Sequence, residues 1–554
     1  MVFPISTYLT YVSQLFLRIL LASQAIFVQR QPPPDQPPRH SNTLHRLLKD
    51  SRVRSAVEQS RLFFPEPILK RLVKEHVRDV LANDLKIEPA RVEHYARIIS
   101  QDAPRLFAIF VEAKKEDHII QILNEDIRDP DLPFVKITSV DGLSLTLVTK
   151  RGTPINTFKT WEPKMLENFE IKQHRALSPV FSRHQHYELG EHDILPFVTN
   201  YAESNSWPKV AGGFGEVYPV RIHRDHHLFG PDDLPVAVKR MFYASNFKLE
   251  QKAYHDLGPS AHPYIIDLLF TYEYGNNLHL VFPWATGTLL QYWQTSPNPV
   301  ITPVFFTWTI QQMAGIASGL AYLHEFKDPT TGESRFGRHG DIKAQNILQF
   351  ASSVGPGIFK IADLGLARVH SKDSRSDVDP KSVRCSPTYS PPDALRGCRI
   401  SRKFDIWSLG AMLLDWCTYS LLDHRAIAQF SDLRLRGSTS FYPEFRQDTF
   451  YTANGEMVNP HVALWVDRLR QLPECSQMMH DILDLVMKRM ILIMPEMRSS
   501  AREITQRLEQ ILARAQEDEE YLCDSRIPHD FALMLSQAAL RVFLIHLLEP
   551  DTSQ

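Results

Sequence analysis

The chain has 554 residues, of which 43% are hydrophobic and 23% charged, which suits a globular protein of roughly two to four folded units. Its 62 basic and 64 acidic side chains give a formal net charge of −2, which excludes a global attraction to nucleic acid or to an anionic membrane. The five cysteines form no C-x-x-C pair, so neither a disulfide framework nor a zinc site is expected.

Residues 1–39 combine an apolar stretch, Tyr8–Val28, with a proline-rich linker, Gln31–Pro38. The apolar stretch could just span a bilayer, but Arg18 would then lie in mid-span, where a charge is costly. It also lacks the basic n-region of a signal peptide. A membrane anchor is therefore less favoured than an interfacial or buried helix or an irregular extension. The prolines predict an extended spacer rather than an SH3 or WW ligand.

Residues 40–200 form a mostly helical N-terminal region of unknown role. Helical spacing of apolar side chains carries this prediction: Ile68, Leu69, Leu72, Val73, Val77, Val80 and Leu81. The alternating stretch Lys136–Thr149 (KITSVDGLSLTLVT) predicts strand. The histidines that follow, His184, His186 and His192, are too scattered to predict a metal site.

From Trp207 onward, short strand-like runs extend to Leu280–Phe282, and long helical patterns follow Pro303. Strands first and helices later predict an α+β arrangement with two lobes. Residues 516–554 form a tail whose amphipathic run, Phe531–Leu548, is expected to pack on the protein or on a partner. Two connections, Arg221–Leu234 and Lys327–Arg338, are expected to be surface loops.

The first chemical motif is glycine-rich, V-A-G-G-F-G-E-V at Val210–Val217. Glycines let backbone amides approach phosphate oxygens closely, although a plain hairpin turn explains such a loop about as well. V-A-V-K at Val236–Lys239 is a strand that ends in lysine, which could reach bound phosphates. Glu250, on a helix expected to start near Asn246, is the carboxylate that could hold this lysine.

The most specific motif is R-H-G-D-I-K-A-Q-N-I-L at Arg338–Leu348. Asp341 could orient an attacking hydroxyl and accept its proton. Lys343 could reach a transferring phosphoryl group, and Asn346 could ligate Mg²⁺. Asp363 follows a strand pattern in K-I-A-D-L-G-L-A and could hold Mg²⁺, which prefers carboxylate and phosphate oxygens.

Taken in this order, the motifs resemble those of the eukaryotic protein kinase family. Ser386–Asp393 (SPTYSPPD) is similar to the A-P-E end of the family's activation segment, and Asp405–Gly410 (DIWSLG) to the start of its central C-lobe helix. Arg498 matches the arginine that pairs with the A-P-E carboxylate, here Asp393. The resemblance covers residues 207–515. Segments on both sides of the glycine loop are also similar to filamentous-fungal kinase-like proteins with an N-terminal helical region.

The resemblance implies a bilobal protein kinase fold, with a β-rich N-lobe and an α-helical C-lobe, and ATP and Mg²⁺ as its ligands. Asp341 would be the catalytic base, assisted by Lys343, and Lys239, held by Glu250, would contact the α- and β-phosphates. Asn346 and Asp363 would hold the metal. The nucleotide would lie against Gly212, Gly213, Gly215, Val217, Ala237, Lys239, the gatekeeper Phe282 and the hinge residues Pro283 and Ala285.

The chain departs from the family pattern at several positions. Val210 replaces the first loop glycine, and Leu364 replaces phenylalanine in D-F-G. Gly340 replaces the arginine of H-R-D, which in the family pairs with a phosphorylated activation loop. We therefore expect a non-RD kinase whose activity does not depend on phosphorylation of Ser371, Ser374, Ser376 or Ser382. Cys385 and Asp393 also depart from the activation-segment pattern.

Lys343, two residues after Asp341, is typical of the family's serine/threonine kinases. The resemblance thus predicts a cytoplasmic serine/threonine kinase that acts on protein substrates and not on nucleic acid. The alternative is a pseudokinase scaffold that binds nucleotide or partner proteins without turnover. A third interpretation makes the N-terminal region an interaction module whose output is the kinase domain.

Overall fold

In the computed structural model the chain divides into two compact units, Met1–Pro179 and Val180–Gln554. The structure describes residues 39–58, 60–138, 145–200, 210–211, 215–230, 232–259, 261–296, 298–352, 355–371, 386–393, 395–398, 400–436 and 447–522. The stretch Tyr8–Val28, the proline-rich linker and the run Phe531–Leu548 lie outside these residues. Within them, no helix combines the length and the apolar character needed to cross a membrane.

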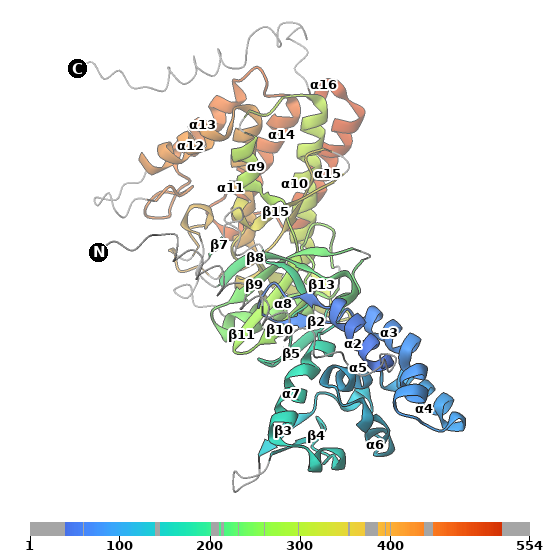
Figure 1. Cartoon of the computed structure of the whole chain (residues 1–554). Helices are drawn as coiled ribbons and strands as arrows, with labels where there is room; N and C mark the ends of the chain where they lie inside the picture. The colour runs from blue at the N-terminus through green and yellow to red at the C-terminus, as the bar shows by residue number, and fades with distance from the viewer. Residues whose placement is uncertain are drawn as a thin grey trace, which may run out of the picture. The chain divides into compact units, whose positions relative to one another are not determined.

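The N-terminal unit is built mainly from helices (Figure 1). They are α2 (His40–Asp50), α3 (Glu66–Asp79), α4 (Pro89–Asp102), α5 (Pro104–Ala113), α6 (Ile119–Asn124) and α7 (Pro163–Gln173). Two short antiparallel pairs join them: β1 (Val53–Arg54) with β2 (Leu62–Phe63), and β3 (Val135–Thr138) with β4 (Leu145–Val148). The helical periodicity is therefore confirmed. The stretch Lys136–Thr149, predicted as strand, is strand at 136–138 and 145–148, and residues 139–144 lie outside the described residues.

The apolar face of α3, predicted from helical spacing, is buried through Leu69, Leu72, Val73 and Val77. It packs with α5, whose residues Leu106–Val111 are all buried. Aromatic rings fill the rest of this core, namely Phe110, Phe134, Phe158, Trp161 and Phe169. The unit thus has a hydrophobic core of its own.

The second unit begins with a seven-stranded sheet in the order β5-β10-β11-β9-β8-β6, with β7 paired to β8. These strands are β5 (His186–Leu189), β6 (Phe197–Asn200), β7 (Val210–Ala211), β8 (Gly215–Ile222), β9 (Leu234–Met241), β10 (Phe270–Tyr274) and β11 (Asn277–Pro283). All neighbours are antiparallel except β5, which is parallel to β10. One helix, α8 (Ala244–Leu257), follows β9.

The two outer strands of this sheet come from a segment that we had expected in the N-terminal region, residues 40–200. β5 and β6 lie at opposite ends of the strand order, so residues 186–200 contribute to both edges. Phe181, just before β5, stacks on Phe270 of β10 with ring centroids 4.2 Å apart. The division between the compact units accordingly falls at Pro179 and not near residue 200.

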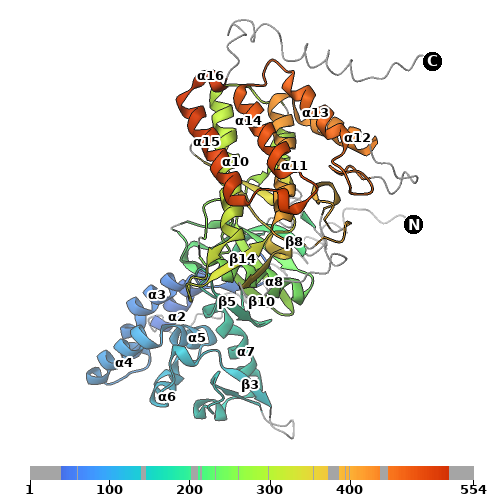
Figure 2. The same cartoon turned by 180° about the vertical axis from the view of Figure 1, so that it is seen from behind.

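Helices dominate the rest of the second unit (Figure 2). They are α9 (Leu289–Thr295), α10 (Pro303–His324), α11 (Lys403–Leu421), α12 (His424–Arg436), α13 (Pro460–Arg470), α14 (Gln477–Leu485), α15 (Ala501–Glu517) and α16 (Glu519–Leu522). Three short strands, β12 (Gly287–Thr288), β15 (Ile347–Phe350) and β16 (Ile358–Ile361), form one small sheet. The strands-then-helices order confirms the expected α+β fold with a β-rich and a helical lobe.

The connection Lys327–Arg338, expected to be a surface loop, is largely a β-hairpin. β13 (Phe326–Lys327) pairs with β14 (Ser334–Arg338), which also pairs with β17 (Arg368–Ser371). Asp328 holds the turn, because its carboxylate accepts hydrogen bonds from the backbone of Thr330 and Thr331. Gly337 and Arg338 at the end of β14 are buried, so the surface-loop prediction was wrong for this part.

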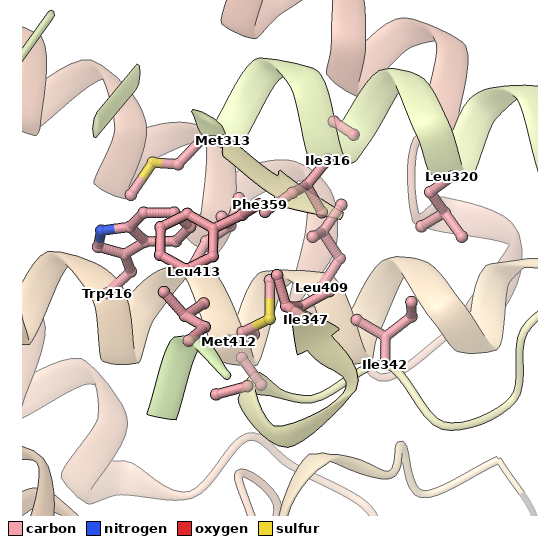
Figure 3. Close-up of a cluster of buried hydrophobic side chains, with 14 of the residues drawn as sticks. Met313, Ile316, Leu320, Ile342, Ile347, Phe359, Leu409, Met412, Leu413 and Trp416 are labelled. Atoms are coloured by element: carbon pink, nitrogen blue, oxygen red, sulfur yellow. The ribbon is translucent and has the colours of Figure 1, made fainter. Parts of the chain in front are cut away.

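The helical lobe has an apolar core that reaches the residues of the motif at Arg338–Leu348 (Figure 3). Ile342 and Ile347 are fully or almost fully buried among side chains of α10 and α11. They flank positions 343–346, which include the polar Lys343 and Asn346, so burying these two side chains fixes the ends of the loop between them. The polar residues of the motif are thereby carried on a rigid base.

Candidate active site

The side chains of Lys239 and Glu250 are in contact, as predicted, and the carboxylate of Asp363 also contacts Lys239. On β9, Val236 and Val238 are buried on one face, which turns Lys239 to the other. On α8 the buried positions include Phe247, Glu250 and Tyr254, so helical spacing brings the Glu250 side chain to the packed face.

The contacts among these three charged groups are short. Lys239 Nζ lies 2.8 and 2.7 Å from the two carboxylate oxygens of Glu250 and 2.9 Å from Asp363 Oδ1. The side chain of Glu250 is 1% exposed and that of Lys239 is 13% exposed. One ammonium group therefore bridges two carboxylates, that of Glu250, which is buried, and that of Asp363, which is 39% exposed.

The pKa values of the three groups reflect this arrangement. Burial raises the pKa of Glu250 to about 7, although Lys239 pulls it down. Burial alone would lower the pKa of Lys239, but attraction to Glu250 and Asp363 outweighs it and raises that pKa. Burial also acts to raise the pKa of Asp363, but Lys239 more than offsets this and lowers it. Two carboxylates against one ammonium leave negative charge that a bound cation would balance.

Asp363 has a left-handed backbone, with φ of 65° and ψ of 71°. This conformation is uncommon for a residue other than glycine and is typical of sites where function requires it. Gly365 makes room for the arrangement, because a Cβ there would lie 3.2 Å from Asp363 Oδ1 and 3.3 Å from Glu250 Oε2. The glycine of the D-L-G motif thus allows both carboxylates to approach the same point.

Asp341 and Asn346 lie together in the loop at the helical lobe. Asn346 Nδ2 donates to Asp341 Oδ2 at 3.0 Å and to the Asp341 backbone carbonyl at 2.8 Å. Because the amide nitrogen of Asn346 is engaged, the amide oxygen is the group that could bind a cation. Asn346 and Asp363 thus offer the oxygen ligands that Mg²⁺ prefers, and the donor set fits this metal.

Two further groups fix the Asp341 carboxylate. Lys343 Nζ lies 2.7 Å from Asp341 Oδ2 and donates to Ser386 Oγ at 2.6 Å. The backbone N–H of Ser386 donates to Asp341 Oδ1 at 3.1 Å. Ser386, the first described residue after position 371, therefore contacts both charged side chains of the loop. The sequence motif did not assign this contact to Ser386.

Asp405, the first acidic residue of α11, holds the backbone of the same loop through its carboxylate. Its carboxylate accepts hydrogen bonds from the backbone N–H groups of His339 and Gly340, both at 2.8 Å. His324 also contacts it, with Nε2 2.8 Å from Asp405 Oδ2. Gly340 has φ of 84°, a conformation that favours glycine. The sequence marked D-I-W-S-L-G as a helix start but did not predict that Asp405 positions the loop.

Gly340 brings no guanidinium to this loop, and the neighbouring Arg338 is directed elsewhere. Arg338 is buried, with its guanidinium carbon 5.8 Å from the ring centroid of Phe404. It donates to the backbone carbonyl of Ile400 at 3.4 Å. Arg338 is thereby tied to the base of α11.

The residues expected beside the nucleotide base lie on adjacent strands. Val217 pairs with Lys239, and Ala237 pairs with Phe282. Phe282 is buried, with its ring centroid 5.3 Å from that of Tyr254 on α8. Pro283 ends β11, and Ala285 follows two residues later and is half-buried.

Of the predicted glycines, the structure describes one. Gly215 begins β8, where a Cβ would overlap the backbone carbonyl of Arg240 on β9, so only glycine fits. Gly212 and Gly213 lie outside the described residues. Their predicted phosphate contacts stay predictions.

The predicted pair of Asp393 and Arg498 is confirmed. Arg498 Nη1 and Nη2 donate to the two carboxylate oxygens of Asp393 at 2.9 and 2.6 Å. Both side chains are fully buried. The bidentate pair therefore fastens the end of the segment that contains Ser386 to the helical lobe.

Comparison with known proteins agrees with this geometry. The model of the protein kinase domain matches residues 211–508, more than half of the chain. The human tyrosine-protein kinase FRK is 29% identical over 221 residues, 39% of this chain and 38% of that protein. The leucine-rich repeat receptor protein kinase EMS1 of Arabidopsis thaliana is 29% identical over 231 residues, 41% of this chain and 17% of that protein.

A third relative, the G-type lectin S-receptor-like serine/threonine-protein kinase CES101 of Arabidopsis thaliana, is 26% identical over 286 residues. The match covers 50% of this chain and 30% of that protein. The chain thus spans less than two fifths of the length of these curated relatives. They include both a tyrosine kinase and a serine/threonine kinase by name.

Proposed function

Because the chain belongs to the protein kinase family, we propose that it transfers the γ-phosphoryl group of Mg·ATP to serine and threonine hydroxyls of protein substrates. The observation that carries this proposal is that polar and charged side chains form two clusters of direct contacts. One consists of Lys239, Glu250 and Asp363, and the other of Asp341, Lys343 and Asn346. All six side chains that the proposed phosphoryl transfer would use lie in contact within their clusters, which supports the proposal.

In this proposal Lys239 binds the α- and β-phosphates, and Glu250 keeps its ammonium group aimed at them. Mg²⁺, when bound, neutralises phosphate charge. Asp363 and Asn346 would hold it through their side-chain oxygens. The Asp341 carboxylate accepts the proton of the attacking hydroxyl and orients that hydroxyl. Lys343 stabilises negative charge on the phosphoryl oxygens as the bond to the leaving group breaks.

The preference for serine and threonine rests on Lys343 and its surroundings. This ammonium group lies between the Asp341 carboxylate and the Ser386 hydroxyl, close to the side chain that would receive the substrate hydroxyl. Phosphoamino-acid analysis tests this preference, and dominant phosphotyrosine would contradict it.

The test of the activity itself is incorporation of labelled phosphate from ATP and Mg²⁺ into the chain and into generic protein substrates. Wild type is compared with Asp341→Ala. Incorporation that is lost in the variant supports an active kinase. Absence of incorporation in both, with both proteins folded and binding ATP, would favour a pseudokinase scaffold.

We further propose that the kinase domain spans residues 207–515 and that residues 180–200 complete its sheet. Residues 40–179 would form a separate module, and residues 516–554 a tail. A cytoplasmic location is proposed because the reaction requires ATP. Contact with a membrane through residues 8–28 stays the less favoured hypothesis.

A further inference from the structure

Six basic side chains gather on the N-terminal unit at one point of the fold. We call them the basic cluster: His45, Lys49, Arg52, Lys114, Lys172 and Arg175. They come from three helices that are far apart in the sequence. α2 and the residues after it supply the first three, the end of α5 supplies Lys114, and the end of α7 and the turn that follows supply the last two.

A single buried carboxylate, Glu112, lies at the base of the cluster. Its side chain is 1% exposed. Arg175 Nη1 donates to Glu112 Oε2 at 2.8 Å, and Arg52 contacts the other carboxylate oxygen. Lys172 Nζ donates to the backbone carbonyl of Glu112 at 2.8 Å. Three cations thus share one residue as an acceptor.

Positive charge exceeds the negative charge available to it. Glu112 contributes one negative charge, and the C-terminal ends of α2, α5 and α7 contribute roughly half a charge each. These do not balance the five lysines and arginines, even with the exposed Asp50 at the end of α2 counted. The Nε of Arg52 is also buried without a hydrogen-bond partner among the described residues, so donors exceed acceptors.

The pKa values indicate that the cations act on one another. Burial, and then the charge of Arg175, lower the pKa of Arg52 to about 10. Burial followed by Arg175, Arg52 and Lys114 lowers the pKa of Lys172. The pKa of His45 is lowered by burial and by four of the cations. Such repulsion is relieved when an anion binds.

The side chains of the cluster differ in solvent exposure, so that a ligand could reach the exposed ones first and the half-buried ones next. Lys49 and Lys114 are exposed, whereas Arg52, Lys172 and Arg175 are half-buried behind them. The backbone fixes Arg175, because its carbonyl accepts a hydrogen bond from the N–H of Phe64 at 2.9 Å. Guanidinium groups held in this way match the oxygens of a phosphate group.

We propose that the basic cluster binds a phosphate monoester, carried either by a phosphorylated serine or threonine side chain or by a small phosphorylated molecule. The half-buried guanidinium groups would contact the phosphate oxygens, and the exposed lysines would attract the dianion. The proposal concerns residues 45–175 and does not depend on phosphoryl transfer by the kinase domain.

The test is isothermal titration of the full chain at constant ionic strength, in the Asp341→Ala background so that turnover plays no part. The probes are inorganic phosphate, O-phospho-L-serine, and a neutral serine peptide in phosphorylated and unphosphorylated forms. The test variant is Lys49→Gln with Lys114→Gln, which leaves the contacts to Glu112 in place. Lys74→Gln, an exposed lysine on α3 outside the cluster, is the matched control.

We expect saturable binding of a phosphorylated probe, at least tenfold weaker in the double variant and unchanged in the control. A peptide that binds tenfold more tightly than free phosphoserine would identify a protein side chain as the source. Equal affinities would identify a small molecule. The proposal is overturned if no phosphorylated probe binds saturably or if the double variant binds as tightly as wild type.

Discussion

Replacing Arg498 by alanine is expected to destabilise the kinase domain strongly, because Arg498 and Asp393 form a fully buried ion pair. Arg498 donates two hydrogen bonds to Asp393, at 2.9 and 2.6 Å, and further ones to the backbone carbonyls of Leu492, Lys403 and Ile493. Its removal would leave a buried carboxylate without a counter-charge. Breaking one partner of such a pair costs about 3–5 kcal/mol in the free energy of unfolding.

The measurement is urea denaturation followed by tryptophan fluorescence, for which Trp407 is a local probe. The guanidinium carbon of Arg498 lies 5.1 Å from the centroid of that ring. Arg502→Ala, an exposed arginine at the start of α15, is the matched control and should change stability by no more than about 0.5 kcal/mol. Replacing both partners by apolar residues of similar volume should restore much of the loss. A loss below about 1 kcal/mol for Arg498→Ala would refute the reasoning.

Three further predictions concern the metal, the activation segment and pH. Asp363→Ala should abolish the Mg²⁺ dependence of nucleotide affinity, whereas Asp341→Ala should keep it and lose turnover; equal loss of Mg²⁺ dependence in both, measured by titration with and without EDTA, would contradict the assigned roles. Gly340 offers no charge partner to a phosphorylated segment, so phosphate incorporation should stay largely intact when alanine replaces four serines, Ser371, Ser374, Ser376 and Ser382. Loss of incorporation in a folded variant would contradict this. Burial lowers the pKa of His279 to about 4. As pH falls below about 6.5, this histidine is protonated in the unfolded state but stays neutral in the folded state, so stability is lost progressively down to about pH 4. His279→Phe should keep the stacking on Tyr272 and remove roughly 3 kcal/mol of this pH dependence, and parallel stability–pH profiles would contradict it.

The sequence predicted those parts of the site that motifs of fixed spacing encode. Asp341 and Asn346 are five residues apart in one loop, and both side chains lie where that spacing suggests. The pairing of Lys239 with Glu250 was also predicted, since a strand followed directly by a helix brings the two elements together. Matching to the family supplied the Asp393–Arg498 pair, which spacing alone could not have predicted across 105 residues.

Contacts between distant segments were missed because no local pattern records them. β5 and β6 read as part of a mixed, histidine-containing stretch, and their partners, β10 and β8, come later in the chain. The same holds for Asp405, which holds the backbone of His339 and Gly340 from 65 or more residues away. The signal available in the sequence was an aspartate at the start of an otherwise apolar helix, since an unpaired carboxylate buried there would be costly.

The departures from the family pattern change side chains while leaving the charged contacts in place. Leu364 is fully buried where the family has phenylalanine, so its apolar role is kept with less volume. Asp393 is one methylene shorter than glutamate, yet it reaches Arg498 with two short hydrogen bonds. Gly340 loses a guanidinium but still donates its backbone N–H to Asp405. Among the described residues, the contacts that position Asp341 and Asp363 are therefore intact, and Gly340 supplies no side-chain cation for a phosphorylated segment. We therefore expect activity that does not wait for phosphorylation of this segment, and the variant with the four serines replaced tests that expectation.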